Sequence, residues 1–469
     1  MLEKLYKNPK QTLYILIAFM AVFATFYNAF IPLHGDEAYY WMWSQHLQMG
    51  YYDHPPMIAY LIYLTGFISD AEWGVRLVNV LSFSISALYI YKLTAEISDE
   101  RTALNAVLIF FSVLVVQAGY IITTPDSPLI MFWTLSLYYS YRAIFYGELR
   151  DYILSGVMLG FTMLSKYSAI LLVAAIVLYI LIKRRDILLG YKIYVAMLLA
   201  LLVIAPMLYW NYQHEWISFL FQLHHGATDD FTIKIGKMFE FLGGQFGVFS
   251  PVFAWVLFYY LIKERFFFKD ERLFFLSLTI ITTLGLFLYK SLFKSMALNY
   301  GAPAYIAGVI IVAFVISKYR LDRTFKIGLL IALFFSIVAR YMFMFHLDII
   351  REEMYKSDKA VEKFLSYKKE GEKLFADHLT DAAYIEYYSP NHERADVVIP
   401  SRFSQYDMWR EDDYLQDGIV LARYRPREKE LKKLYRNVEL LEHYIIIPDV
   451  RSFYFYRVSE PKKEAFNTN

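Results

Sequence analysis

The chain has 469 residues, of which 58% are hydrophobic and 19% aromatic, so it carries more apolar surface than a soluble fold of its size can bury. A net charge of +2 gives no global field that would attract nucleic acid. Cysteine is absent, which excludes disulfides, thiolate metal sites and cysteine nucleophiles.

Apolar runs of roughly the 20 residues that a helix needs to cross a bilayer follow one another along most of the chain. The first run follows Lys4, Lys7 and Lys10 and has no small-x-small cleavage site after it, so we interpret it as a retained anchor. The pattern predicts about eleven transmembrane helices, near residues 12–31, 75–93, 102–122, 129–146, 152–165, 168–183, 191–210, 243–262, 273–289, 302–317 and 325–345.

The loops between these runs alternate in charge, and this alternation predicts the orientation. Basic residues gather at the N-terminus and in every second loop, which the positive-inside rule places in the cytoplasm. Residues 31–73 contain no Lys or Arg but five acids, so this segment must face outward. An odd number of spans then puts the C-terminal domain on the same outer side of the membrane.

Two domains are predicted: a membrane domain over residues 1–345, whose outer loop 31–74 folds as interfacial helices, and a soluble domain over residues 346–469. Within the loop, residues 37–48 are rich in aromatics that suit the headgroup layer, and residues 57–67 follow Pro55 and Pro56. The C-terminal domain holds nearly half of the charged residues and mixes a helical signal at 352–369 with β-like runs at 397–399, 419–422, 444–447 and 453–458. We expect a mixed α/β domain.

The outer loop contains two acidic motifs, His34-Gly35-Asp36-Glu37 and Tyr51-Tyr52-Asp53-His54-Pro55-Pro56. Adjacent carboxylates near a low-dielectric boundary can bind a cation or act as a base. The alternative is an acidic helix start, since the helix dipole favours Asp and Glu in the first turn. Spacing alone leaves both interpretations open.

Three charged residues near other predicted outer helix ends are further candidates. Asp126, in Thr123-Thr124-Pro125-Asp126-Ser127-Pro128, is either functional or an ordinary helix cap before Pro128. Lys166 and Arg76 lie on the outer side, where the positive-inside rule disfavours them. Cations placed there suit the phosphate of a lipid headgroup, although snorkelling to the interface would also explain them.

The remaining outer loops supply candidate metal ligands and cavity residues. The loop over residues 211–240 holds His214, Glu215, His224 and His225. His with carboxylate is metal-ligand chemistry, but this spacing matches no defined metal motif, so a divalent cation is a candidate without an assigned site. Another outer loop could line the same cavity and holds Lys290, Lys294, Asn299 and Tyr300. Tyr300 alone would be ordinary for a membrane interface.

These segments, in this order, resemble the bacterial membrane glycosyltransferases related to the dolichyl-phosphate-mannose protein mannosyltransferases and to the lipid A aminoarabinose transferase. The resemblance covers most of the membrane part. It is carried by residues 36–41, 52–56, 124–129, 211–226 and 299–305, and residues 404–409 look like a piece of the family's periplasmic domain.

The resemblance implies a GT-C fold with a cavity under the first outer loop, a polyprenyl-phosphate sugar donor and inversion at the anomeric carbon. It makes Asp36 the essential loop aspartate, Asp126 the second essential acid and Lys166 a phosphate-binding lysine. The aminoarabinose transferases have a Lys before the Pro-Pro pair, where this chain has His54.

We therefore expect an inverting hexosyl or pentosyl transferase, monomeric, acting on an envelope acceptor such as lipid A or the lipopolysaccharide core, a protein or another glycan. The alternatives are a transporter or flippase for lipid-linked sugars and a non-catalytic scaffold; acids in outer loops rather than at the bilayer midplane favour surface chemistry. The predicted residues are catalytic Asp36, Asp126 and Glu37, phosphate-binding Lys166, Arg76 and His54, and cavity-lining Asp53, Tyr52, His225, Asn299 and Tyr300.

Overall fold

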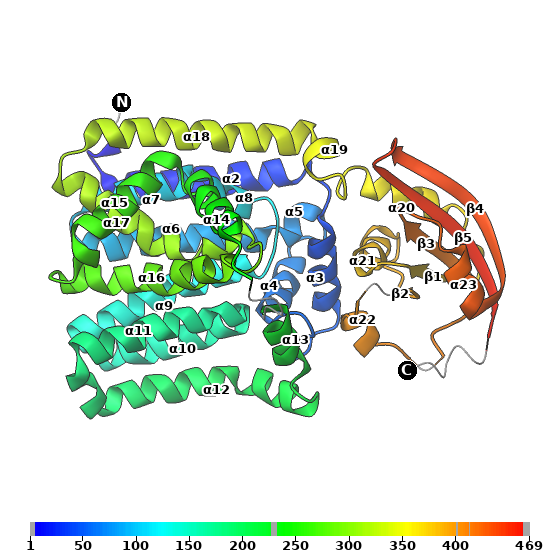
Figure 1. Ribbon diagram of the computed structural model, residues 1–469, viewed down its shortest axis with the longest axis horizontal. Coiled ribbons are helices and arrows are strands. Elements are labelled where there is room, and N and C mark those ends of the chain that lie inside the picture. Colours follow the sequence, from blue (N-terminus) through cyan, green and yellow to red (C-terminus); the bar gives the residue numbers. More distant parts are fainter. Residues whose placement is uncertain (1–4, 227–231, 400–401, 412, 463–469) are drawn as a thin grey trace. The chain divides into compact units, whose positions relative to one another are not determined.

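The computed structural model describes residues 5–226, 232–399, 402–411 and 413–462 (Figure 1). By compactness the chain divides into two units, which are described separately. The first comprises Met1–Asn28, His54–Leu61 and Arg76–Arg340, and the second comprises Ala29–Asp53, Ile62–Val75 and Tyr341–Asn469.

The first unit consists of helices that pack along one another. Helix α6 packs against α7 and α9, α9 packs against α10, and α10 packs against α12, while α16 packs against α11 and α17. The main helices are α2 (Pro9–Asn28), α6 (Leu77–Ile97), α7 (Glu100–Ser112), α9 (Asp126–Tyr146), α10 (Leu149–Ser165), α11 (Ile170–Lys183), α12 (Tyr191–Gln213), α16 (Glu271–Ser291), α17 (Ala304–Lys318) and α18 (Asp322–Phe345).

Burial differs sharply between these helices. Almost every residue of α17 is buried, whereas large apolar side chains such as Leu202 on α12 and Leu330 on α18 are 58% and 69% exposed. Long helices with exposed apolar faces, such as α12 and α18, are typical of helices that contact lipid. Within the described ranges, five helices are long and apolar enough to cross a membrane, or six if one bent pair counts as a span. The chain is therefore a multi-pass membrane protein, while the count of eleven spans stays a prediction.

Two predicted spans are wrong as continuous helices. The run at 102–122 ends as α7 at Ser112, and a short helix, α8 (Leu114–Gly119), follows after extended Val113. The run at 243–262 corresponds to α14 (Ile235–Val248) and α15 (Pro251–Lys263), which are bent by 114°. The bend follows from Pro251, which cannot continue a preceding helix, and from Ser250, whose φ is 75°. The other predicted runs correspond to helices that end within a few residues of the predicted limits.

The second unit contains a five-stranded sheet with the order β2-β1-β3-β5-β4 (Figure 1). Strands β2 and β3 run parallel to β1, whereas β5 runs antiparallel to both β3 and β4, with Val420 opposite Tyr456. Phe375, Val420 and Tyr456 are among the buried residues of its core. The strands are β1 (Lys373–Ala376), β2 (Ala395–Val397), β3 (Gly418–Arg423), β4 (Tyr435–Ile447) and β5 (Arg451–Pro461), with helices α20 (Ser357–Leu365), α21 (Leu379–Tyr388), α22 (Gln405–Met408) and α23 (Glu428–Leu434).

This unit confirms the predicted mixture of helix and sheet, with corrections to its elements. The helix predicted at 352–369 is shorter, and β1 and α21 were not predicted. The β-like runs at 397–399, 419–422, 444–447 and 453–458 fall at the end of β2 or within β3, β4 and β5.

The sequence pattern assigned the outer loop 31–74 to the membrane domain. Most of this loop instead belongs to the second compact unit. It forms α3 (Gly35–Gln45), α4 (Met57–Gly66) and α5 (Glu72–Val75), of which α3 packs against α21. This packing requires glycine at the start of α3, because a Cβ atom on Gly35 would lie 2.6 Å from the Cβ of Thr380.

Candidate functional site

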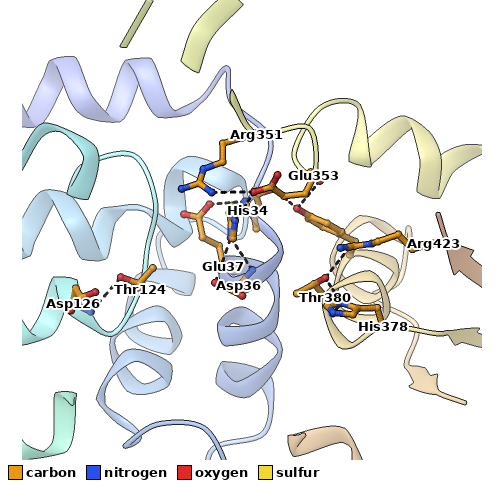
Figure 2. A network of polar contacts seen from close by, with 12 residues as sticks. His34, Asp36, Glu37, Thr124, Asp126, Arg351, Glu353, His378, Thr380 and Arg423 are labelled. Atoms are coloured by element: carbon orange, nitrogen blue, oxygen red, sulfur yellow. Dashed lines mark hydrogen bonds and ion pairs between the residues drawn. The ribbon is translucent and has the colours of Figure 1, made fainter. Parts of the chain in front are cut away.

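Asp126 lies at the centre of a polar cluster in the first unit. It is the first residue of α9, where its backbone N–H donates to Thr124 Oγ1 at 3.3 Å (Figure 2). Lys166, directly after α10, donates from Nζ to Asp126 Oδ1 at 2.7 Å. Asn299 Nδ2 donates to the other oxygen, Oδ2, also at 2.7 Å. Three residues that the sequence offered as separate candidates therefore meet at one carboxylate.

Tyr300 completes this Asp126 cluster, with its ring centroid 5.3 Å from Lys166 Nζ, within reach of a cation–π interaction. Asn299 and Tyr300 lie on the short 3₁₀ helix η4 (Leu298–Gly301). Gln245 Nε2 holds this helix by donating to the carbonyl of Leu298 at 3.2 Å. The loop that supplies the amide and the ring is thus fixed by a neighbouring helix, α14.

The Asp126 cluster is partly shielded from water, since the side chains of Lys166 and Asp126 are only 16% and 18% exposed. Both carboxylate oxygens of Asp126 already accept a hydrogen bond, so this group is better suited to hold a neighbouring cation than to accept a substrate proton. An ammonium group carries three N–H donors. Lys166 can therefore hold Asp126 and a phosphate oxygen at the same time.

Asp36 and Glu37, at the start of α3 in the second unit, differ in their surroundings. His34 caps the helix: its Nδ1 accepts from the backbone N–H of Asp36 at 3.1 Å, and its own backbone N–H donates to Glu37 Oε2 at 2.8 Å (Figure 2). Glu37 is fully buried, whereas the Asp36 side chain is 49% exposed. Glu37 thus serves the helix start, and Asp36 is the carboxylate accessible to a substrate.

His34 also contacts Glu353, which the sequence did not single out. The distance between His34 Nε2 and Glu353 Oε1 is 3.1 Å. Burial lowers the pKa of His34, but the hydrogen bond to Glu353 and the charges of Asp36, Glu37 and Glu353 outweigh burial and raise it above its ordinary value. Burial raises the pKa of Glu353, but the hydrogen bond from His34, a backbone hydrogen bond and the charges of His34 and Arg351 together outweigh burial and lower it to about 2.

The pair predicts a defined dependence of stability on pH. The contribution of Glu353 is present above about pH 4.5 and is lost as the pH falls through about 2. The contribution of His34 is full below about pH 6.5 and is lost as the pH rises through its raised folded-state pKa. The melting temperature of the purified protein should fall as the pH rises above about 6.5, because the contribution of His34 is lost. We expect this fall to be smaller in Glu353→Gln and unchanged in the control Glu352→Gln. Identical profiles for Glu353→Gln and the wild type would contradict the pairing.

Asp53 has polar partners on two sides within the second unit. Tyr39 donates from its hydroxyl to Asp53 Oδ2 at 2.8 Å, and Arg402 Nη1 lies 2.6 Å from Oδ1. Burial raises the pKa of Asp53, against the charge of Arg402, which lowers it. Gln405 links this loop to α22, because its Oε1 accepts from the backbone N–H of Tyr52 at 2.8 Å. No motif in the sequence pointed to Arg402 as the partner of Asp53.

The other predicted residues stay predictions. Arg76 is fully buried and donates from Nη1 to the carbonyl of Asn28 at 3.1 Å. His54 is half-buried at the start of a short stretch of the first unit. His225 belongs to α13 (Ile217–Gly226), and its side chain falls outside the described part of the chain. In the residues that the structure describes, no group of three or more His, Asp or Glu side chains could hold a metal ion.

The chain is similar to known proteins in sequence and in fold. Residues 53–210 match the family model described as dolichyl-phosphate-mannose-protein mannosyltransferase. The predicted family resemblance is therefore confirmed. The matched segment includes Asp53, Asp126 and Lys166, and thus two members of the Asp126 cluster.

A curated relative and two solved structures extend this family resemblance. The lipid A galacturonosyltransferase RgtD of Rhizobium johnstonii is 25% identical over 283 residues, which are 59% of this chain and 59% of that protein. The apo crystal structure of ArnT from Cupriavidus metallidurans has a TM-score of 0.70 at 12% identity and covers 97% of this chain and 100% of that one. The same protein bound to undecaprenyl phosphate gives 0.70 at 13% identity, covering 96% and 99%. The chain thus has the GT-C fold of ArnT.

Proposed function

We propose that this chain is an inverting glycosyltransferase that moves a sugar from a polyprenyl-phosphate carrier to lipid A or the lipopolysaccharide core. The reaction takes place at the periplasmic face of the inner membrane. The observation that carries this proposal is the Lys166 ammonium, fixed between Asp126 and the ring of Tyr300. A fold shared with a protein that binds undecaprenyl phosphate, and a relative named as a lipid A galacturonosyltransferase, support this substrate class.

In the proposed step, the bond between the anomeric carbon and the donor phosphate oxygen breaks. An acceptor hydroxyl oxygen forms the new bond from the opposite face of the sugar, which inverts the anomeric carbon. The bonding electrons leave with polyprenyl phosphate, so negative charge grows on that oxygen. Lys166 stabilises this charge, and a fixed cation in a partly dry site needs little reorganisation to do so. Asp126 holds Lys166 in place.

The acceptor hydroxyl must lose a proton as it attacks, and we assign this proton to Asp36. Its carboxylate is half exposed, and its helix start is fixed by the His34 cap and by the buried Glu37. A positioned general base of this kind contributes typically 10²-fold or more in rate. Asp126, with both oxygens occupied, adds negative charge that favours an oxocarbenium-like sugar in the transition state.

We expect Lys166→Ala to raise the KM for the lipid-phosphate donor by roughly tenfold or more, because a charge-assisted contact to phosphate is lost. Because the same ammonium stabilises the charge that grows in the transition state, kcat should fall too, so that kcat/KM drops roughly a hundredfold or more. The KM for the acceptor should change little. The measurement is the initial rate of transfer by the purified protein as the donor concentration is varied.

Lys10→Ala is the control, since Lys10 is a lysine of the first unit whose side chain is 70% exposed. Its donor KM should equal that of the wild type. An unchanged donor KM in Lys166→Ala would remove Lys166 from the phosphate site.

A further inference from the structure

The second unit contains a cavity of about 360 Å³ next to the C-terminal end of α3. This volume is at the lower end of the roughly 300–1,000 Å³ that is usual for small-ligand sites, and it suits one or two sugar rings. The cavity is lined by Met42, His46, Leu47, Gln48, Glu386, Arg394, Tyr406 and Trp409.

One side of this cavity is aromatic and apolar. The rings of Trp409 and His46 are tilted against each other with centroids 5.1 Å apart. Leu47 lies beside them and is 44% exposed, so an apolar surface is open to a ligand. A sugar ring has a face of C–H groups that packs well on such a surface, and its other edges carry hydroxyls.

The other side of the cavity is polar and fixed. Arg394 Nη2 donates to the carbonyl of Trp409 at 2.9 Å and pairs with Asp396 at 3.2 Å. Glu386 is 5% exposed, its Oε1 accepts from the N–H of Ala395 at 3.3 Å, and burial raises its pKa to about 8. At neutral pH this carboxyl is protonated and can donate as well as accept, which matches the hydroxyls of a sugar.

Hydrogen bonds and ring contacts join the segments that form the walls of the cavity in the absence of a ligand. Gln405 Nε2 donates to Gln48 Oε1 at 3.3 Å, and the rings of Tyr406 and Tyr39 stack with centroids 6.0 Å apart. Ser404 and Asp407 cap α22 reciprocally. Residues 404–409, which resemble the family's periplasmic domain, therefore build a wall of this cavity. A preformed site loses little conformational entropy on binding.

We propose that this cavity binds one or two sugar residues of the acceptor glycan. The inference rests on the proposed function, which supplies a glycolipid acceptor. It gives the second unit a role in acceptor selection that is separate from the Asp126 cluster.

Leu47→Arg tests the inference, because Leu47 is exposed enough to be replaced without disturbing the core. The probe is the deacylated lipopolysaccharide oligosaccharide, which keeps the sugars of lipid A and of the core, from a strain lacking this protein. Its binding to the purified full chain is measured by saturation-transfer NMR. We expect at least tenfold weaker binding by Leu47→Arg, and a higher KM for the acceptor with an unchanged KM for the donor.

Leu440→Arg is the control, since Leu440 is 50% exposed on β4 and does not line the cavity. Equal binding by Leu47→Arg and Leu440→Arg would overturn the inference. A wild-type chain that transfers sugar but does not bind the oligosaccharide would overturn it too, while leaving the proposed function intact. Binding that Leu47→Arg abolishes, in a chain that transfers nothing, would support the cavity and overturn the proposed function.

Discussion

Asp126→Asn should lower kcat/KM for sugar transfer at least a hundredfold while the protein stays folded. Asn keeps the shape of the side chain and can still contact Asn299, but it removes the negative charge 2.7 Å from Lys166. A partly buried ammonium that has lost its carboxylate partner is less well placed, because the charge-assisted hydrogen bond that holds it is weakened. Transition-state stabilisation that depends on the fixed cation is then lost.

The measurement is the rate of transfer by purified variants, with Asp186→Asn as a control, since Asp186 is an exposed acid whose side chain is 64% accessible. Because Lys166 and Asp126 act as a pair, the double variant with Lys166→Ala should be scarcely worse than the more damaging single variant. If the rate loss in the double variant equals the product of the two single losses, the coupling is contradicted. Full activity of Asp126→Asn would show that the Asp126 cluster takes no part in catalysis.

Asp36→Asn should also lower transfer by at least a hundredfold, but for a different reason. The variant keeps the helix cap, because His34 accepts from the backbone of residue 36 and not from its side chain. It removes the carboxylate that we propose as the base for the acceptor, together with a negative charge 3.7 Å from His34 Nδ1. The loss should therefore appear in kcat, with the donor KM unchanged, in contrast to Lys166→Ala.

Glu37→Gln is the informative comparison for Asp36→Asn. The amide oxygen of Gln can still accept from the backbone N–H of His34, so the helix start should persist. A small effect of Glu37→Gln beside a large effect of Asp36→Asn assigns the chemistry to Asp36 alone. Transfer at the wild-type rate in Asp36→Asn would exclude Asp36 as the base.

The sequence predicted the helices well because length and hydropathy control membrane helices strongly. It failed where local backbone geometry intervened, as at Pro251, where one apolar run becomes two helices bent by 114°. It also missed β1, whose four residues carry too little pattern to distinguish a strand.

Candidate residues could be recognised one by one, but their partners could not. The contact between Asn299 and Asp126 joins positions 173 residues apart, and no spacing rule connects them. The same holds for Arg402 with Asp53 and for Glu353 with His34, because no motif marks Arg402 or Glu353. Glu37 is a similar case, because the sequence does not show which acid of the adjacent pair is buried at the helix start and which is exposed.

The most direct test of the account is transfer by the purified protein alone in proteoliposomes. These contain an undecaprenyl-phosphate sugar and lipopolysaccharide from a strain lacking the protein. We predict that undecaprenyl phosphate and a glycan heavier by one sugar residue accumulate in equal amounts. Passage of the intact donor across the bilayer, with no change in the mass of the acceptor, would contradict this and identify a transporter.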